Sequence, residues 1–111
     1  MFDSLIEFGQ CVAINLTFAG AEDKTVAVVP AGQKWVVTYM HLECSATIDL
    51  IVKSGATEIT GFIAMTATSV FDIESSGAPV FKATATGDDL ILRASGACDV
   101  DGWAYYALVS K

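Results

Sequence analysis

The chain has 111 residues, of which 53% are apolar and 17% are charged. This length suits one domain with a buried core, and the composition lies far from that of disordered chains. Thirteen acidic and six basic residues give a net charge of −7, and the basic residues are scattered singly along the chain. Because attraction to a phosphate backbone requires clustered Lys and Arg, we expect no nucleic-acid partner.

No segment approaches the roughly 18–20 unbroken apolar residues that a membrane-spanning helix needs. One of the longest uncharged stretches, residues 59–71, is interrupted by glycine, threonine and serine. The chain begins Met-Phe-Asp, and neither a basic start nor a long apolar segment with a cleavage site follows. We therefore expect a soluble protein without an export signal and without a membrane partner.

Alternating apolar residues and Gly-containing turns recur about every 8–12 residues along the chain, which is typical of sandwiches and barrels. We predict an all-β fold, an antiparallel β-sandwich or jelly roll of about eight strands. A short N-terminal arm over residues 1–10 should precede a single domain over residues 11–111. The expected strands, in chain order, are 11–18, 25–29, 34–44, 47–53, 57–65, 69–73, 80–84, 90–95 and 100–110.

The first expected strand, 11–18, is apolar at every second residue. One of its faces should therefore meet the core, and the residues on that face are Val12, Ile14, Leu16 and Phe18. A polar loop over residues 20–24 leads to the short strand 25–29. The turn over residues 30–33, where proline presets φ and glycine tolerates a positive φ, then predicts a hairpin with 34–44.

The strand 34–44 is partly apolar on both faces. Strict alternation places Trp35, Val37 and Tyr39 on one side and Val36, Met40 and Leu42 on the other. We therefore expect this strand to be covered on both sides.

The strand 47–53 has a clear alternating pattern and ends in a Ser-Gly-Ala turn. Shorter strands are expected at 57–65 and 69–73, followed by a loop over residues 74–79. In the last third of the chain, turns at 86–89 and 96–99 separate the strands 80–84, 90–95 and 100–110.

The last strand, 100–110, carries large apolar or aromatic residues on both faces, and a single sandwich core can bury only one of them. Exposed apolar clusters of this kind usually mark a surface for self-association or docking. The predicted interface consists of large residues on the strand faces that point away from the expected core. These residues are Trp35, Ile51, Ile91, Trp103 and Tyr105. The alternative is that these residues are scattered, or buried by an extra strand or by the N-terminal segment.

The N-terminal segment adds further apolar residues to the predicted interface: Phe2, Leu5, Ile6 and Phe8. The segment is too short to form a stable isolated helix. Either it is an arm that orders on a neighbouring molecule, or it caps the bottom of its own sandwich.

The cysteines Cys11, Cys44 and Cys98 form no CxxC pair, and we expect buried free thiols. His41 is the single histidine, and on an alternating strand it should be a surface or packed residue. We therefore expect no metal site. The segment 99–102 suggests a calcium loop only distantly, because the ladder of oxygen ligands and the terminal Glu of an EF-hand are missing.

Catalytic machinery is not apparent. The carboxylates lie in expected turns or at strand ends, where solvated acids are the norm, and the chain has no Gly-x-Ser-x-Gly elbow, P-loop or GxGxxG segment. We expect a protein that is not an enzyme, with no catalytic residues and no cofactor. A carbohydrate-binding module is a further alternative, in which Trp35 and Trp103 would stack on sugars.

Two stretches resemble small jelly-roll virion proteins of tailed bacteriophages, in particular capsid decoration or cement proteins. One is residues 46–61 (ATIDLIVKSGATEITG). The other runs through residues 77–81 (GAPVF) and 85–97 (ATGDDLILRASGA) to 100–106 (VDGWAYY). These motifs consist of turn glycines and alternating strand residues that shape the fold. They identify no functional residue in this chain.

The resemblance implies a homotrimer that binds the major capsid protein on the surface of the phage head and stabilises the capsid lattice. It implies a virion location after synthesis in the host cytoplasm. A tail, baseplate or fibre component of the same fold is the alternative. Many weak, repeated contacts suit this role, because avidity can hold such a protein in place without any chemistry.

Overall fold

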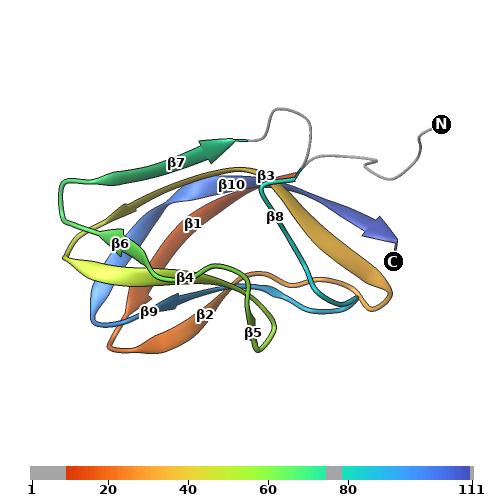
Figure 1. Cartoon of the computed structure of the whole chain (residues 1–111), viewed down its shortest axis with the longest axis horizontal. Helices are drawn as coiled ribbons and strands as arrows, with labels where there is room; N and C mark the ends of the chain where they lie inside the picture. Colours follow the sequence, from red (N-terminus) through yellow and green to blue (C-terminus); the bar gives the residue numbers. More distant parts are fainter. Residues whose placement is uncertain (1–9, 75–78, 111) are drawn as a thin grey trace.

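The computed structural model describes residues 10–74 and 79–110, which form two antiparallel sheets packed face to face (Figure 1). Sheet A has the order β1 (Gln10–Phe18), β10 (Cys98–Ser110), β3 (Gln33–Cys44), β7 (Val70–Glu74), and β8 (Phe81–Lys82) also pairs with β3. Sheet B has the order β2 (Glu22–Ala27), β9 (Leu90–Ala94), β4 (Ile48–Ser54), β5 (Thr57–Glu58), and β6 (Ile63–Met65) also pairs with β4. The predicted all-β antiparallel sandwich is confirmed.

Strand positions agree with the sequence patterns to within two residues except in three places. The strand expected at 25–29 is β2, which starts at Glu22 inside the expected polar loop and pairs with β9. The expected hairpin between this strand and 34–44 is therefore wrong, because β2 belongs to sheet B and β3 to sheet A. The segment 57–65 forms two separate short strands, and the segment 80–84 is reduced to Phe81–Lys82. Gln10 belongs to β1 instead of the expected arm, and residues 1–9 lie outside the described part. Within that part, no helix is long and apolar enough to cross a membrane.

The core lies between the two sheets and is built from every second residue of the facing strands. The first strand behaves as its pattern predicts, because Ile14 and Phe18 are buried while Val12 and Leu16 pack against the core. Burial of each large apolar side chain is worth about 1.5–3 kcal/mol, so this layer supplies the main stabilisation. Its fully buried members from the other strands include Met40, Leu42, Leu50, Val52, Leu90, Leu92 and Val100.

A β-bulge at Thr38 reverses the two faces of β3. Tyr105 pairs with Tyr39, but the next residue of β10, Tyr106, pairs with Val37, so Thr38 is the extra residue on β3. An inserted residue shifts the alternation of side chains by one position. Before the bulge the odd-numbered residues face the core, whereas after it they face outward.

Trp35 therefore lies in the core and not on the predicted interface. Strict alternation placed Trp35 and Tyr39 on the same face, which is wrong because the bulge lies between them. The indole is fully buried, while Tyr39 lies on the outer face of sheet A. Trp35 is thus excluded from both the expected docking surface and the expected sugar platform.

The outer face of sheet B is covered by an ion-pair network and is not an exposed apolar cluster. Asp23 of β2 bonds to Lys53 Nζ at 2.8 Å and to Arg93 Nη1 at 3.1 Å. Arg93 stands directly opposite Ile51, and Lys53 directly opposite Ile91. Long cationic side chains can cover apolar neighbours with their stems. Ile51 is accordingly buried and Ile91 half-buried, so neither belongs to an exposed interface.

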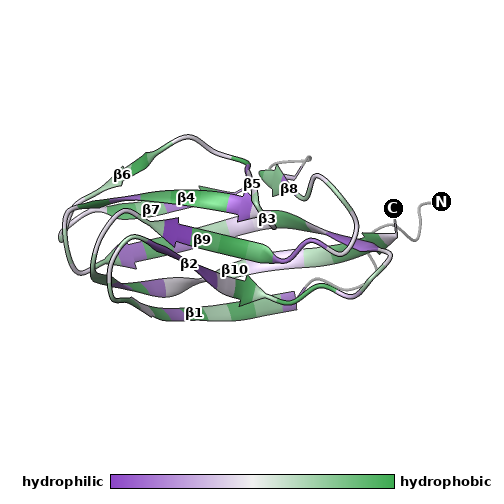
Figure 2. Cartoon of the chain, turned by 90° about the horizontal axis from the view of Figure 1, so that it is seen from below, coloured by the Kyte–Doolittle hydropathy of each residue, from purple (hydrophilic) through white to green (hydrophobic). Residues whose placement is uncertain are grey.

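Charged and apolar residues are mixed along the strands of sheet B. In Figure 2, β2 and β9 each carry both hydrophilic and apolar segments. The cations of the network lower the pKa of Asp23, the hydrogen bond from Lys53 having the largest effect. The ionised carboxylate is therefore the form that holds the network together.

Acidic residues of the 84–89 loop also differ from their expected solvated state. Ser54, which is fully buried, donates a hydrogen bond to Asp88 Oδ2 at 2.9 Å and accepts one from the backbone N–H of Thr84 at 3.0 Å. The Asp89 carboxylate accepts the backbone N–H of Val29 at 2.9 Å. These carboxylates fasten the loop to β4 and to the turn that follows β2.

The cysteines divide into one accessible thiol and two buried ones. Cys44 and Cys98 are buried, as expected, but Cys11 is exposed on β1, so the expectation of a buried thiol is wrong there. Burial raises the pKa of Cys44 to about 11, and it also raises the pKa of Cys98. A thiol with a raised pKa holds little reactive thiolate near neutral pH.

Titration of the native protein with a thiol reagent at pH 8 should therefore modify Cys11 rapidly and leave Cys44 and Cys98 unmodified. Denaturation should make the remaining two thiols accessible to the reagent. A Cys11→Ser variant is the control, and it should show no rapid phase. Rapid modification of more than one thiol in the native wild-type protein would contradict the burial of Cys44 and Cys98.

Candidate functional site: the aromatic surface of sheet A

Four ring-bearing side chains gather on the outer face of sheet A, and we call them the aromatic surface: Tyr39, His41, Trp103 and Tyr105. They come from β3 beyond the bulge and from the adjacent strand β10. Register brings them together, because Trp103 stands opposite His41 and Tyr105 opposite Tyr39. Directly opposite residues on one face lie close enough to contact each other.

The rings pack against one another while leaving apolar area exposed. Trp103 stacks on His41 with ring centroids 4.3 Å apart and an angle of 12° between the planes. Tyr39 lies 6.4 Å from Trp103 and 5.8 Å from Tyr105 by the same measure. Trp103 is 40% exposed and Tyr105 49% exposed, so the sheet presents two large aromatic groups at its surface.

Carboxylates on both sides of His41 hold its imidazole in place. Its Nδ1 lies 2.8 Å from Asp72 Oδ2 on β7, and its Nε2 lies 2.8 Å from Glu43 Oε2. Tyr39 donates its hydroxyl hydrogen to the same Asp72 oxygen at 2.8 Å. Because both ring nitrogens face carboxylates, the protonated imidazolium, which donates from both, fits this site best.

The electrostatics of this cluster agree with its geometry. Hydrogen bonds to Asp72 and then to Glu43 raise the pKa of His41, and the hydrogen bond from His41 lowers the pKa of Asp72. The hydrogen bond to Asp72 also raises the pKa of Tyr39. The cluster therefore fixes His41, and with it one face of the Trp103 indole, in a single orientation.

We expect NMR titration to give His41 a pKa above its ordinary value of 6.5. Since folding raises this pKa, the stabilising contribution is fully present below about 6.5 and is lost as pH rises through the folded-state pKa. Asp72→Asn should lower the pKa of His41, whereas Asp49→Asn on sheet B should leave it unchanged. A wild-type value at or below 6.5 would contradict the paired imidazolium.

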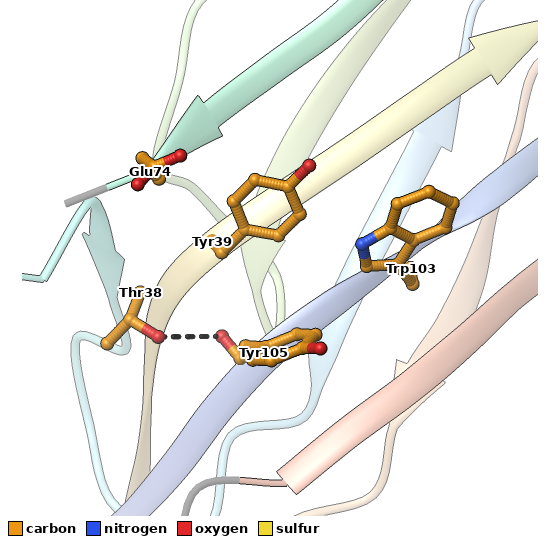
Figure 3. Close-up of a pocket in the computed structure, with 5 residues that line it drawn as sticks. All are labelled: Thr38, Tyr39, Glu74, Trp103 and Tyr105. Carbon is orange, nitrogen blue, oxygen red and sulfur yellow. Dashed lines mark hydrogen bonds between the residues drawn. The ribbon is translucent and has the colours of Figure 1, made fainter.

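A shallow hollow of about 480 Å³ lies beside these rings, lined by Thr38, Tyr39, Glu74, Trp103 and Tyr105 (Figure 3). The bulge residue Thr38 donates its hydroxyl hydrogen to the Tyr105 carbonyl at 3.4 Å, which links the two strands at the hollow. Glu74, at the end of β7, contributes a carboxylate to the rim. The hollow thus combines aromatic faces with negative charge.

The predicted interface residues do not all lie together in the structure. Trp103 and Tyr105 lie together on the exposed face, whereas Trp35 and Ile51 are buried and Ile91 is half-buried on the other sheet. The arm residues of the prediction, Phe2, Leu5, Ile6 and Phe8, lie outside the described residues.

Sequence reasoning missed two members of the surface, Tyr39 and His41. The signal that could have found them is the alternation of Tyr39, His41 and Glu43 beyond Thr38, which matches the outward face of a strand. It was obscured because the apolar residues before the bulge suggested the opposite register.

No protein-family model matches the chain, and no curated protein does. Among solved structures, a chain of the cyanophage Pam1 capsid asymmetric unit has a TM-score of 0.59 and 18% identity, covering 96% of this chain and 89% of that one. A chain from the disulfide-linked pili of Bacillus endospore appendages has a TM-score of 0.56 and 10% identity, covering 97% and 91%. At these identities the likeness shows a shared fold, and that fold occurs in a phage capsid.

Proposed function

We propose that this protein is a non-enzymatic structural protein of a tailed-bacteriophage virion. In this proposal it is a capsid decoration, or cement, protein that is made in the host cytoplasm, binds the major capsid protein at the head surface as a homotrimer and stabilises the capsid lattice. The observation that carries the proposal is the aromatic surface, a cluster of four rings of which Trp103 and Tyr105 are exposed. The sequence resemblance to decoration proteins and the fold shared with a phage capsid chain support it.

The aromatic surface has the properties of a binding hot spot. Trp and Tyr are enriched at such sites because they offer large contact areas and lose little conformational entropy on binding. Stacking on His41 already restrains Trp103, and the hydrogen bond to Asp72 restrains Tyr39. A surface ordered before binding loses less entropy when the partner arrives. Repeated over many copies on a capsid, modest contacts of this kind would give firm attachment.

Light scattering and co-sedimentation test this proposal together. The purified chain should have the mass of three copies, and it should sediment with undecorated heads of the phage that encodes it. Tyr105→Ala should weaken sedimentation with heads, while Phe62→Ala, which removes an aromatic ring that is 74% exposed outside the aromatic surface, should not. A monomer that fails to bind heads would overturn the proposal. Binding to isolated tails alone would favour a tail, baseplate or fibre component instead.

Carbohydrate binding is a second candidate function, favoured by the exposed rings of Trp103 and Tyr105 beside a hollow. Aromatic faces on a β-sandwich can stack on sugar rings. A glycan array probed with the wild-type chain and with Trp103→Ala tests this candidate. Specific glycan binding that disappears in Trp103→Ala would support it, and no binding to any glycan would exclude it.

A further inference from the structure

We propose that the hollow beside the aromatic surface binds an arginine side chain presented by a basic segment of a partner protein. This inference rests on the proposed function, because it names the chemistry of the partner that the aromatic surface contacts. Three features of the described residues carry it: the charge of this face, the arrangement of the rings and an internal contact of the same kind.

The charge of this face is negative. Five carboxylates share the outward face of β3 beyond the bulge, β7 and the first half of β10, where the only basic group among the described residues is His41. These carboxylates are Glu43, Asp72, Glu74, Asp99 and Asp101. The whole chain also has a net charge of −7. Such a field attracts a basic segment and repels an acidic one.

Glu74 is the carboxylate placed to meet a ligand. Asp72 and Glu43 are both engaged with His41, whereas Glu74 lines the hollow and accepts no side-chain hydrogen bond from residues 10–74 or 79–110. A guanidinium group can bond to a carboxylate with two parallel N–H groups while its flat face rests on an aromatic ring. Arginine therefore satisfies both kinds of lining group at once.

Three of the rings line the hollow in which such a cation would lie. The ring centroid of Tyr39 lies 5.8 Å from that of Tyr105, and the two planes are nearly perpendicular at 78°. Trp103 completes the group at 6.4 Å from Tyr39. Because cation–π attraction acts within about 6 Å of a ring centroid, one group in the hollow can interact with several rings.

The protein already contains a contact of this type. His41, whose nitrogens both face carboxylates, stacks on Trp103 at 4.3 Å. When the imidazole is protonated, this arrangement joins a planar cation, an aromatic face and a carboxylate. An arginine in the hollow would repeat the same combination with Tyr39, Tyr105 and Glu74. A neutral sugar would use the rings but would gain nothing from the negative charge around them.

The test is an NMR titration of the ¹⁵N-labelled full chain with two capped peptides, Gly-Arg-Gly-Arg-Gly and its counterpart with citrulline in place of arginine. Citrulline keeps the shape of the side chain and removes its charge. The arginine peptide should shift the indole N–H resonance of Trp103, which is assigned by its loss in Trp103→Phe. The citrulline peptide should bind about tenfold more weakly or not at all, since it lacks the cation.

Two charge-matched variants localise the effect. Glu74→Gln should weaken binding of the arginine peptide about fivefold or more, because it removes the carboxylate of the hollow. Glu58→Gln, at an exposed position on β5 of sheet B, should leave the affinity unchanged. Equal binding of the two peptides, or equal weakening by the two variants, would overturn the inference. Shifts of Trp103 caused by a neutral oligosaccharide but not by the arginine peptide would also overturn it.

Failure of this inference can be separated from failure of the proposed function, because the titration uses no phage particle. If Glu74→Gln leaves co-sedimentation with phage heads intact and the arginine peptide does not bind, the decoration role stands and the arginine site is wrong. If the peptide binds as expected but the chain does not sediment with heads, the arginine site stands and the decoration role is wrong.

Discussion

Replacing Gly102 with alanine should lower the free energy of unfolding by about 3 kcal/mol or more, enough to unfold much of a marginally stable domain. Gly102 lies in the middle of β10, between Ile14 of β1 and Leu42 of β3. A Cβ atom at this position would overlap the carbonyl oxygen of His41. The residue also has a φ of +153°, a conformation that side-chain-bearing residues rarely adopt.

The overlap is costly because its partner is backbone in the centre of a sheet. Neither β3 nor β10 can move away without losing pairing to its neighbours, and the longest shared ladder of the fold joins these two strands. Urea denaturation followed by tryptophan fluorescence measures the loss. Gly61→Ala is the matched control, since an added Cβ there has nothing within 4 Å, and it should change the stability by about 0.5 kcal/mol or less. A similar loss in both variants would contradict the close approach of β10 to β3.

The same substitution should affect stability at one tryptophan and binding at the other. Trp35→Ala should reduce the free energy of unfolding by about 3–5 kcal/mol, because it empties a fully buried site in the core. Trp103→Ala should cost about 1 kcal/mol or less in stability, because its indole is 40% exposed. It should instead weaken attachment to phage heads by about 30-fold, the loss that corresponds to a hot spot worth 2 kcal/mol.

Conservative variants sharpen this contrast. Trp35→Phe keeps most of the buried ring and removes an indole N–H that has no hydrogen-bond partner among the described residues, so it should cost much less than Trp35→Ala. Trp103→Phe should retain part of the binding. Unfolding curves and co-sedimentation, measured on the same preparations, separate the two effects. A large stability loss in Trp103→Ala, or unchanged binding, would contradict the assignment of Trp103 to a docking surface.

The fold could be predicted from the sequence because local patterns and turn residues agreed with it. In 11–18 the apolar alternation continues without interruption, and the observed strand buries the expected face. At 30–33 the proline and the glycine with φ of +83° form the expected turn, but this turn leads from sheet B to sheet A and does not close the expected hairpin. The start of β2 was missed because it depends on pairing with a strand that is distant in the sequence. Asp23 is polar and resembles a loop residue, but its pairing opposite Arg93 belongs to a strand contact between segments far apart in the chain.

The candidate site could be predicted only in part, because it depends on one bulge. Trp103 and Tyr105 follow from the surplus of aromatic residues on the last strand. Tyr39 and His41 require the extra residue at Thr38, and the alternation beyond that residue is obscured by the apolar residues before it. The role of Asp72 also depends on tertiary structure, since it meets His41 only after β7 pairs with β3.

Cryo-electron microscopy of the intact phage particle tests the central proposal most directly. The account predicts density for this chain on the head surface, with Trp103 and Tyr105 covered by the capsid protein or by a neighbouring copy. Particles that lack the chain, or that carry it with the aromatic surface open to solvent, would contradict the proposal.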